Sequence, residues 1–179
     1  MPAKINIHNP TGLYYVSLTT VHWLAIFVRE HYFQALVDSL KYNIQEKDLN
    51  VYAWCIMPSH LHMIIRSTIY SPRKLLQEFK QHTTKILLWE IRNHPKESRK
   101  EMLLYILGKS GKLIGHEYQF WQQQDSCMPL NSRSAIAQKV EFIHQRPLVA
   151  GFVAEASHWK FSSAIDFDNG HGLLPLAKL

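Results

Sequence analysis

The stretch from Val51 to Arg66 limits the fold more than any other part of the chain. It reads VYAWCIMPSHLHMIIR, in which two β-type runs are joined by a tight connection that contains a proline. Side chains alternate between the two faces of a strand, so His60 and His62 would project side by side from one face. The sequence therefore predicts an antiparallel hairpin, 49–57 with 60–66, that presents two imidazoles together.

Two adjacent imidazoles can bind a divalent metal if a third ligand comes from elsewhere and each ring has a partner that fixes its tautomer. A His-x-His pair on a strand can equally be exposed and bind nothing, because two ligands are a weak motif. The spacing of His60 and His62 alone leaves both interpretations open.

The remaining elements follow from apolar periodicity and from turn and capping residues. We expect strands at 13–20 and 117–122, and helices at 29–46, at 71–93 with Ser71 as cap, at 96–107, and from 131 to an end set by Pro147. The glycine-rich stretch 108–115 lacks the order of a phosphate-binding loop and is expected to be a flexible surface loop. This order of elements predicts an α+β fold, a ferredoxin-like antiparallel four-stranded sheet with helices packed on it.

The composition fits one domain spanning 1–179, with a lead-in at about 1–12 and a tail at about 166–179. The formal net charge of +6 favours a polyanionic partner. Cys55 in an apolar strand and Cys127 in an expected loop offer no disulfide framework. Without a signal-like apolar segment or a membrane-length apolar run, we expect a cytoplasmic protein with no membrane partner.

The helix at 71–93 carries a basic surface of the kind that contacts DNA phosphates, although a solvated helix face would look the same. The expected DNA-binding residues on it are Arg73, Lys74, Lys80, Gln81 and Lys85. Trp121, among glutamines, could be a core anchor or a platform on which a base stacks.

The segment WCIMPSHLHMII resembles the His-hydrophobe-His signature of the HUH single-tyrosine transposases, and most closely the REP-associated tyrosine transposase branch. The likeness extends to the opening TGLYYVSLTTVHWLAIF, to FWQ at 120–122, and to the late segments EFIHQRPLVAGFV and HWKFSSAIDF. It implies metal-assisted DNA strand cleavage and joining during transposition, on single-stranded or hairpin DNA, through a tyrosine that forms a phosphotyrosine. It also implies Mg²⁺ or Mn²⁺ bound by His60 and His62, and leaves a homodimer open.

The chain departs from the family pattern at two positions on the last long helix. The tyrosine of the pattern is Phe142 here, which has no oxygen with which to attack phosphorus. The amide ligand expected one helical turn later is Arg146, which cannot coordinate a metal and is instead a candidate DNA contact. Gln145, one residue earlier, is the candidate third metal ligand.

Three functions therefore remain in competition. The first is a transposase-family DNA-binding protein with impaired cleavage. The second is an inactive nucleic-acid-binding module, unless Tyr105 or Tyr118 acts as a substitute nucleophile. The third is a metal-dependent hydrolase that uses His60, His62 and either Gln145 or Glu141, for which the sequence has no carboxylate-rich metal set.

Overall fold

The computed structural model describes residues 9–178, so most of the predicted lead-in 1–12 and the last residue of the predicted tail 166–179 lie outside the described residues. The elements follow in the order β1 (Tyr14–Thr19), η1 (Val21–Trp23), α1 (Glu30–Glu46), β2 (Asn50–Met57), β3 (His60–Arg66), α2 (Pro72–Asn93), α3 (Lys100–Lys112), β4 (Ser126–Pro129), α4 (Arg133–Val149), η2 (Ala156–His158) and α5 (Ala164–Phe167).

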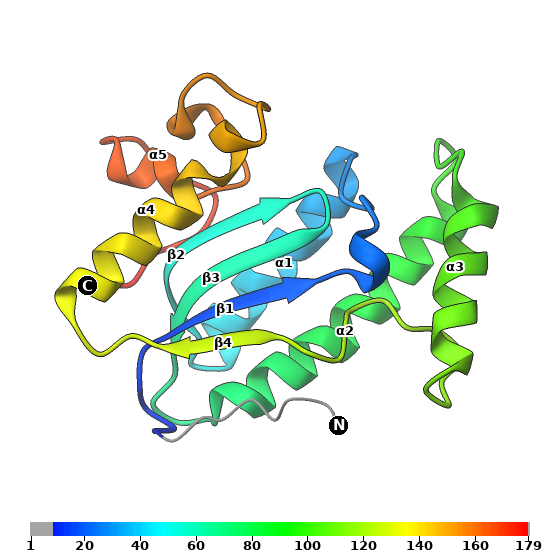
Figure 1. Ribbon diagram of the computed structural model, residues 1–179, viewed down its shortest axis with the longest axis horizontal. Coiled ribbons are helices and arrows are strands. Elements are labelled where there is room, and N and C mark those ends of the chain that lie inside the picture. Colours follow the sequence, from blue (N-terminus) through cyan, green and yellow to red (C-terminus); the bar gives the residue numbers. More distant parts are fainter. Residues whose placement is uncertain (1–8, 179) are drawn as a thin grey trace.

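The four strands form one antiparallel sheet in the order β2-β3-β1-β4 (Figure 1). This is a ferredoxin-like antiparallel four-stranded sheet, as predicted from the sequence, and the α+β fold class is confirmed. The hairpin of β2 and β3 places His60 opposite Met57 on one side and opposite Thr19 of β1 on the other. The histidines thus begin an inner strand that has a neighbour on each edge.

Helices cover both faces of the sheet, but not equally. α1 and α2 pack against each other on one face, over a large apolar core that contains Leu61, Met63 and Ile65 of β3. α4 lies on the other face, over β2 and β3, where a smaller cluster joins Ile143 to Ile64 (Figure 1). The alternating side chains of β3 therefore divide between a structural face and the face that carries the histidines.

The helix starts and the hairpin agree closely with the sequence. Ser71 caps α2, where its hydroxyl accepts from the backbone N–H of Lys74 at 3.4 Å, with Pro72 in the first position. Ser132 caps α4 in the same way, accepting from the N–H of Ala135 at 3.1 Å. These capping residues are sufficient to predict where each helix begins, because each cap forms a hydrogen bond within the first turn of its own helix.

The predicted fourth strand at 117–122 is wrong. Phe120 and Trp121 are both buried, so the segment has no alternation, and it forms only an isolated bridge between Trp121 and Thr20. It crosses the end of β1 instead, where the N–H of Gln122 donates to the Thr19 carbonyl at 2.8 Å. The edge of β1 is taken by β4, which contains Cys127, a residue expected in a loop.

The predicted flexible loop at 108–115 is also wrong, because α3 runs to Lys112. Gly111 is buried, and a Cβ added to it would lie 2.6 Å from backbone atoms of Tyr118. The glycine therefore permits a helix to approach a neighbouring backbone closely, a need that its own sequence neighbourhood does not reveal.

Pro147 does not end α4, which continues to Val149. The stop is made by Gly151 at φ +75°, with the N–H of Gly151 bonded to the Leu148 carbonyl and that of Phe152 bonded to the Pro147 carbonyl, both at 2.9 Å. This pair of bonds is a Schellman motif, which needs a left-handed residue after the helix.

The segment after α5 returns to the body of the protein. Leu174 is buried in the main core, and the N–H of Ala177 donates to the carbonyl of Val51 at 2.8 Å. Between residues 9 and 178, none of the helices combines the length and the apolar character that a membrane span requires.

Candidate functional site at the His60 and His62 pair

His60 and His62 lie side by side on the α4 face of the sheet, as predicted. Their ring centroids are 5.7 Å apart and the ring planes differ by 9°. His62 is buried at 4% exposure, whereas His60, next to the hairpin turn, is half-buried. The strand thus holds two parallel imidazoles at different depths.

Each imidazole is held through its Nδ1 atom by a hydroxyl group. His60 Nδ1 lies 2.7 Å from Ser59 Oγ, and His62 Nδ1 lies 3.0 Å from Tyr15 Oη on β1. With the proton on Nδ1, both hydroxyl oxygens accept, and the Nε2 lone pairs remain available. His62 Nε2 is buried and has no hydrogen-bond partner among the described residues, which is the condition expected of a ligand atom.

The surroundings keep both imidazoles uncharged near neutral pH. Burial, together with the neighbouring His60, Arg146 and Lys139, lowers the pKa of His62 to about 3. Burial and Arg146 also lower the pKa of His60 below its usual value. Burial raises the pKa of Tyr15 against the opposing effects of Ser17 and Arg146, so the phenol keeps its proton. Neutral imidazoles are the form that coordinates a metal.

α4 brings Phe142 to the histidines. Its ring stands edge-on to His62, with centroids 5.9 Å apart, and edge-on to Tyr15 at 6.1 Å. The side chain keeps 39% of its surface exposed, so it belongs to the open face and not to the core. The position at which the resemblance predicts a tyrosine therefore faces the histidine pair.

Two cations flank Phe142 on α4. Lys139 Nζ lies 4.8 Å from the Phe142 ring centroid and 4.5 Å from that of Tyr15, while Arg146 Cζ lies 5.3 Å from Phe142. Arg146 Nε is buried and has no hydrogen-bond partner in the described part of the chain. The pair gives this side of the site a positive potential that favours phosphate and disfavours a metal ion.

The donor set for a metal is incomplete. Within residues 9–178 no three His, Cys, Asp or Glu side chains are grouped so that they could hold an ion. Gln145 is half-buried, and its amide nitrogen donates to Glu141 at 2.8 Å. The residues present therefore fit a metal at two imidazole nitrogens, with the remaining positions open to water, to phosphate oxygen or to the side-chain oxygen of Gln145.

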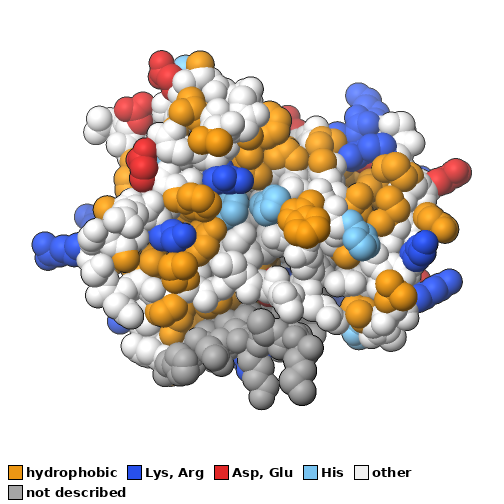
Figure 2. Space-filling view, viewed as in Figure 1, with side chains coloured by type: hydrophobic (Ala, Val, Ile, Leu, Met, Phe, Trp, Pro, Cys, Tyr) orange, Lys and Arg blue, Asp and Glu red, His pale blue; other side chains and the backbone are white. Residues whose placement is uncertain are grey.

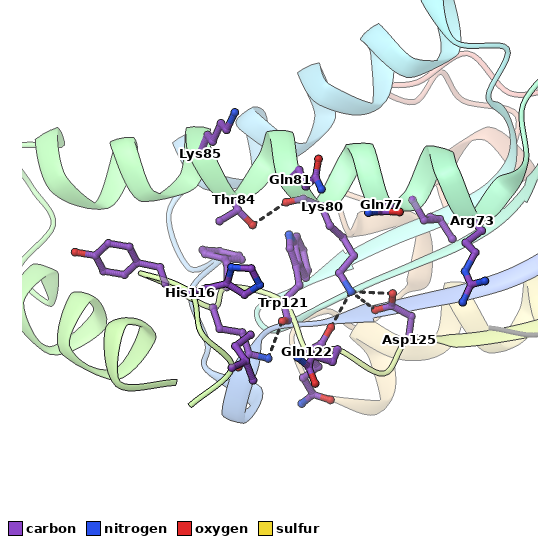
Figure 3. Close-up of a pocket in the computed structure, with 16 residues that line it drawn as sticks. Arg73, Gln77, Lys80, Gln81, Thr84, Lys85, His116, Trp121, Gln122 and Asp125 are labelled. Carbon is purple, nitrogen blue, oxygen red and sulfur yellow. Dashed lines mark hydrogen bonds and ion pairs between the residues drawn. The ribbon is translucent and has the colours of Figure 1, made fainter. Parts of the chain in front are cut away.

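A second feature is an open groove of about 690 Å³ between α2 and the segment 114–125 (Figure 3). Five of the predicted DNA-binding residues line it: Arg73, Lys80, Gln81, Lys85 and Trp121. Figure 3 shows Arg73 and His116 towards opposite ends, with Lys80 reaching Asp125 between them. Lys74 lies outside the groove, near Glu78 and the Tyr70 ring, and Arg146 belongs to the histidine face.

Two of these residues have internal roles. Trp121 is 4% exposed, and its indole N–H donates to Thr83 Oγ1 at 3.0 Å, so it anchors the groove floor. Lys80 Nζ donates to both Asp125 carboxylate oxygens and to the Gln122 carbonyl. Among the described residues that line the groove, the free positive charge therefore comes from Arg73 and Lys85, which are exposed.

Sequence reasoning missed Tyr15, Ser59 and Lys139. Tyr15 reaches His62 across two paired strands, which no local pattern reveals. Lys139 could have been found, because it lies three residues before Phe142 and so on the same helix face. Figure 2 shows the assembled surface, with histidines at its middle and hydrophobic and basic side chains around them.

Comparison with known proteins places this geometry in a family. A family model described as "Transposase IS200 like" matches residues 18–112, more than half of the chain, and includes His60 and His62. Curated proteins give no match.

Among solved structures, a REP-associated tyrosine transposase bound to a REP hairpin has a TM-score of 0.63 and 14% identity, over 95% of this chain and 88% of that chain. A candidate transposase from Deinococcus radiodurans has a TM-score of 0.46 and 15% identity, over 75% of this chain and 89% of that chain. At this identity the first likeness establishes a common fold. Together with the family match over the histidine hairpin and α2, it leads to one conclusion: the chain belongs to the IS200-like transposase family.

Proposed function

We propose that this protein binds structured single-stranded DNA, in the form of a hairpin with unpaired flanking nucleotides, and that it cleaves this DNA poorly or not at all. The observation that carries the proposal is the place of Phe142. Its ring faces His62 at 5.9 Å and is flanked by Lys139 and Arg146, so a side chain without oxygen stands where the family's nucleophile is expected.

Charge and shape support DNA as the partner. Arg73 and Lys85 are exposed along an open groove, and Gln81 beside them adds a neutral donor. Lys139 and Arg146 add positive charge at the histidines. Phosphate groups are recognised by such combinations of cations and amides without regard to base sequence. A structure of this fold has been solved with a REP hairpin, which makes a hairpin the first substrate to test.

A divalent metal, Mg²⁺ or Mn²⁺, fits the Nε2 atoms of His60 and His62. When bound, such an ion would neutralise negative charge on the oxygens of the scissile phosphate. The Ser59 and Tyr15 hydroxyls contact Nδ1 of the two rings and can accept its proton in a hydrogen bond, which leaves Nε2 free for the ion. Gln145 donates its amide N–H to Glu141, so its side-chain oxygen is the atom that could join them, and Arg146 opposes the ion by charge. We therefore expect metal binding that is weaker than in a site with three protein ligands.

The family reaction requires a tyrosine oxygen that attacks phosphorus and leaves a free 3′ hydroxyl. Phe142 cannot supply that oxygen. Tyr15 is close to His62, but its hydroxyl contacts Nδ1, on the side of the ring away from the free Nε2, and the side chain is 5% exposed. It is placed to orient the histidine and not to attack DNA.

The second candidate function is an inactive binding module, and the exchange of two residues on α4 favours it. Phe142 removes the nucleophile and Arg146 places a cation where an amide ligand is expected. A metal-dependent hydrolase has less support, because within the described residues no carboxylate completes the histidine pair and Glu141 is engaged by Gln145.

Hairpin binding at increasing salt tests the proposal. Fluorescence anisotropy with a labelled hairpin carrying an unpaired foot should give a dissociation constant that rises steeply between 50 and 200 mM salt, on the order of 10- to 1,000-fold for a few phosphate contacts. A blunt duplex of equal length should bind more weakly. Equal affinity for both DNAs, or a dissociation constant that does not change with salt, would remove this function from consideration.

A further inference from the structure

The loop that follows β1 holds an exposed tryptophan in an unfavourable backbone conformation. His22 and Trp23 have φ of 54° and 53°, the left-handed region that non-glycine residues rarely adopt. Such a conformation is strained and persists only where the surrounding structure imposes it. The Trp23 side chain is nevertheless 65% exposed, so burial of the indole does not offset the strain.

Hydrogen bonds tie this loop to the turn that carries the histidines. The N–H of Thr20 donates to the Ser59 carbonyl at 3.0 Å, and the N–H of Phe27 donates to the Pro58 carbonyl at 2.9 Å. Thr19, just before the loop, is paired with His60. The backbone of residues 20–27 is therefore fixed against the hairpin turn next to the first histidine.

The same loop is also fixed to the groove. The N–H of Val21 donates to the Phe120 carbonyl at 2.8 Å, and the amide of Gln122 donates to the Thr20 carbonyl at 3.3 Å. Phe120 and Gln122 both line the groove. His22 adds a contact from its Nε2 to Ser110 Oγ of α3 at 2.9 Å.

The loop thus lies between the two candidate DNA-binding features. In Figure 1 it is the blue segment between the tip of the β2–β3 hairpin and α3. Its backbone is bonded directly to the turn before His60 and to residues that line the groove, so Trp23 stands on a segment that both features share.

We propose that Trp23 is a stacking platform for one unpaired nucleobase of the DNA strand on its way from the groove to the histidines. This rests on the proposed function. A flat, exposed indole beside cationic surface is the arrangement with which single-strand-binding proteins hold bases without reading their sequence. Charge complementarity selects the occupant, because the neighbouring groove and histidine face carry Arg73, Lys85, Lys139 and Arg146.

Other tryptophans of the chain provide a contrast. Trp54 and Trp121 are buried core residues. Trp89 is 61% exposed, much like Trp23, but it lies on regular helix α2, does not line the groove and has no bond to the histidine hairpin. It is therefore the matched control for loss of an exposed indole.

The test is hairpin binding by the full chain and by three variants, Trp23→Ala, Trp23→Phe and Trp89→Ala. The hairpin carries an unpaired foot, and a series of oligonucleotides replaces each foot nucleotide in turn by an abasic site. Trp23→Ala should weaken binding about 5- to 100-fold, Trp23→Phe should retain most of the affinity, and Trp89→Ala should bind like the parent. One abasic position should weaken the parent and leave Trp23→Ala unaffected.

Because the indole is exposed, the melting temperature of Trp23→Ala should match that of the parent. If Trp23→Ala does not fold, its melting curve will show this, and the hairpin affinities of Trp23→Phe and the parent are compared instead. If the parent binds the hairpin while Trp23→Ala binds equally well and every abasic site acts alike in both, the stacking role is overturned and the proposed function stands. If the parent does not bind the hairpin, the proposed function itself fails, and the stacking role fails with it.

Discussion

The two faces of the sheet are built from the same strands but serve different purposes. On the α1 and α2 face, β3 contributes Leu61, Met63 and Ile65 to the main core, and each side chain is at most 1% exposed. On the α4 face the same strand presents His60, His62 and Ile64, and α4 packs there over a smaller apolar cluster. Because side chains alternate between the faces of a strand, β3 places its core residues on one face and its histidines on the other.

This division explains how the protein can keep its fold while its site changes. Phe142 and Arg146, which we expect from the resemblance to be the two departures from the family pattern, are both on α4, and neither contributes to the main core. Substitutions there alter what faces the histidines and leave the packing of α1 and α2 on the sheet intact. The experiments below test whether the two faces are as independent as the structure indicates.

Leu61→Ala should have the largest effect and should act on stability. Leu61 is fully buried, so truncation removes apolar contacts and leaves a cavity, at a cost of about 3 kcal/mol in the free energy of unfolding. His60→Ala, on the other face, should change that free energy by less than about 1 kcal/mol. Urea unfolding measures both. A similar loss for the two variants would mean that the histidine face is part of the structural core.

Glu97→Gln should have the next largest effect, again on the structural side. Burial alone would raise the pKa of the Glu97 carboxyl, but hydrogen bonds from Arg99 and Tyr32 overcome it and lower the pKa to about 2. The Tyr32 hydroxyl donates at 2.6 Å, and Arg99 donates through Nε at 3.0 Å. Loss of these charge-assisted bonds should cost about 2–3 kcal/mol at pH 7.

The pH dependence of this loss has a definite sign. Since the folded pKa lies below the usual value of 4.5, the stabilisation is fully present above about pH 4.5 and disappears as the pH falls towards 2. Unfolding curves of the parent and Glu97→Gln should therefore converge in acid. A constant difference from pH 7 to pH 2 would contradict the assigned role of the charge.

Tyr15→Phe should act on the histidine face. Removal of the hydroxyl 3.0 Å from His62 Nδ1 frees the ring to rotate and to change tautomer, so the dissociation constant for Mn²⁺ should rise about 10- to 100-fold. Tyr14→Phe is the control, because Tyr14 is also buried but faces the main core and bonds to Asn9. Titration calorimetry should separate the two. Equal Mn²⁺ affinity in parent and Tyr15→Phe would exclude this positioning role.

Arg73→Ala should have the smallest effect, on DNA binding alone. Loss of one phosphate contact should weaken hairpin binding about 3- to 10-fold and reduce the slope of log affinity against log salt by about 0.7–0.9. Lys96→Ala, which removes an exposed cation outside the groove, should leave the slope unchanged. If both variants change the slope equally, the net charge of the whole protein, and not a phosphate contact in the groove, determines the salt dependence of binding.

The sequence predicts best what depends on neighbouring residues. The β2–β3 hairpin follows from alternation around Pro58, and the starts of α2 and α4 follow from Ser71 and Ser132. The strand predicted at 117–122 is wrong because the segment bonds to Thr19 and Val21, which are about a hundred residues away in the sequence. The loop predicted around Gly111 is wrong because this glycine lies in a helix that packs closely against the backbone of a later segment.

The candidate site shows the same limit. His60 and His62 share one strand, so their pairing can be predicted from spacing. Tyr15 reaches His62 from another strand and Phe142 approaches from α4, and neither contact follows from local pattern. The role of position 142 is a prediction from the resemblance, which cannot supply the geometry that the structure shows.

The most direct measurement of the central claim is formation of a covalent protein–DNA adduct. The parent, Phe142→Tyr and Phe142→Tyr combined with Arg146→Asn would each be incubated with Mn²⁺ and a labelled hairpin and resolved on a denaturing gel. We predict hairpin binding but no adduct for the parent, and an adduct mapping to position 142 for the double variant, with less for the single variant, because the Arg146 guanidinium competes for phosphate oxygens and repels the metal. An adduct with the parent, or a double variant that binds both Mn²⁺ and hairpin yet forms none, would contradict the account.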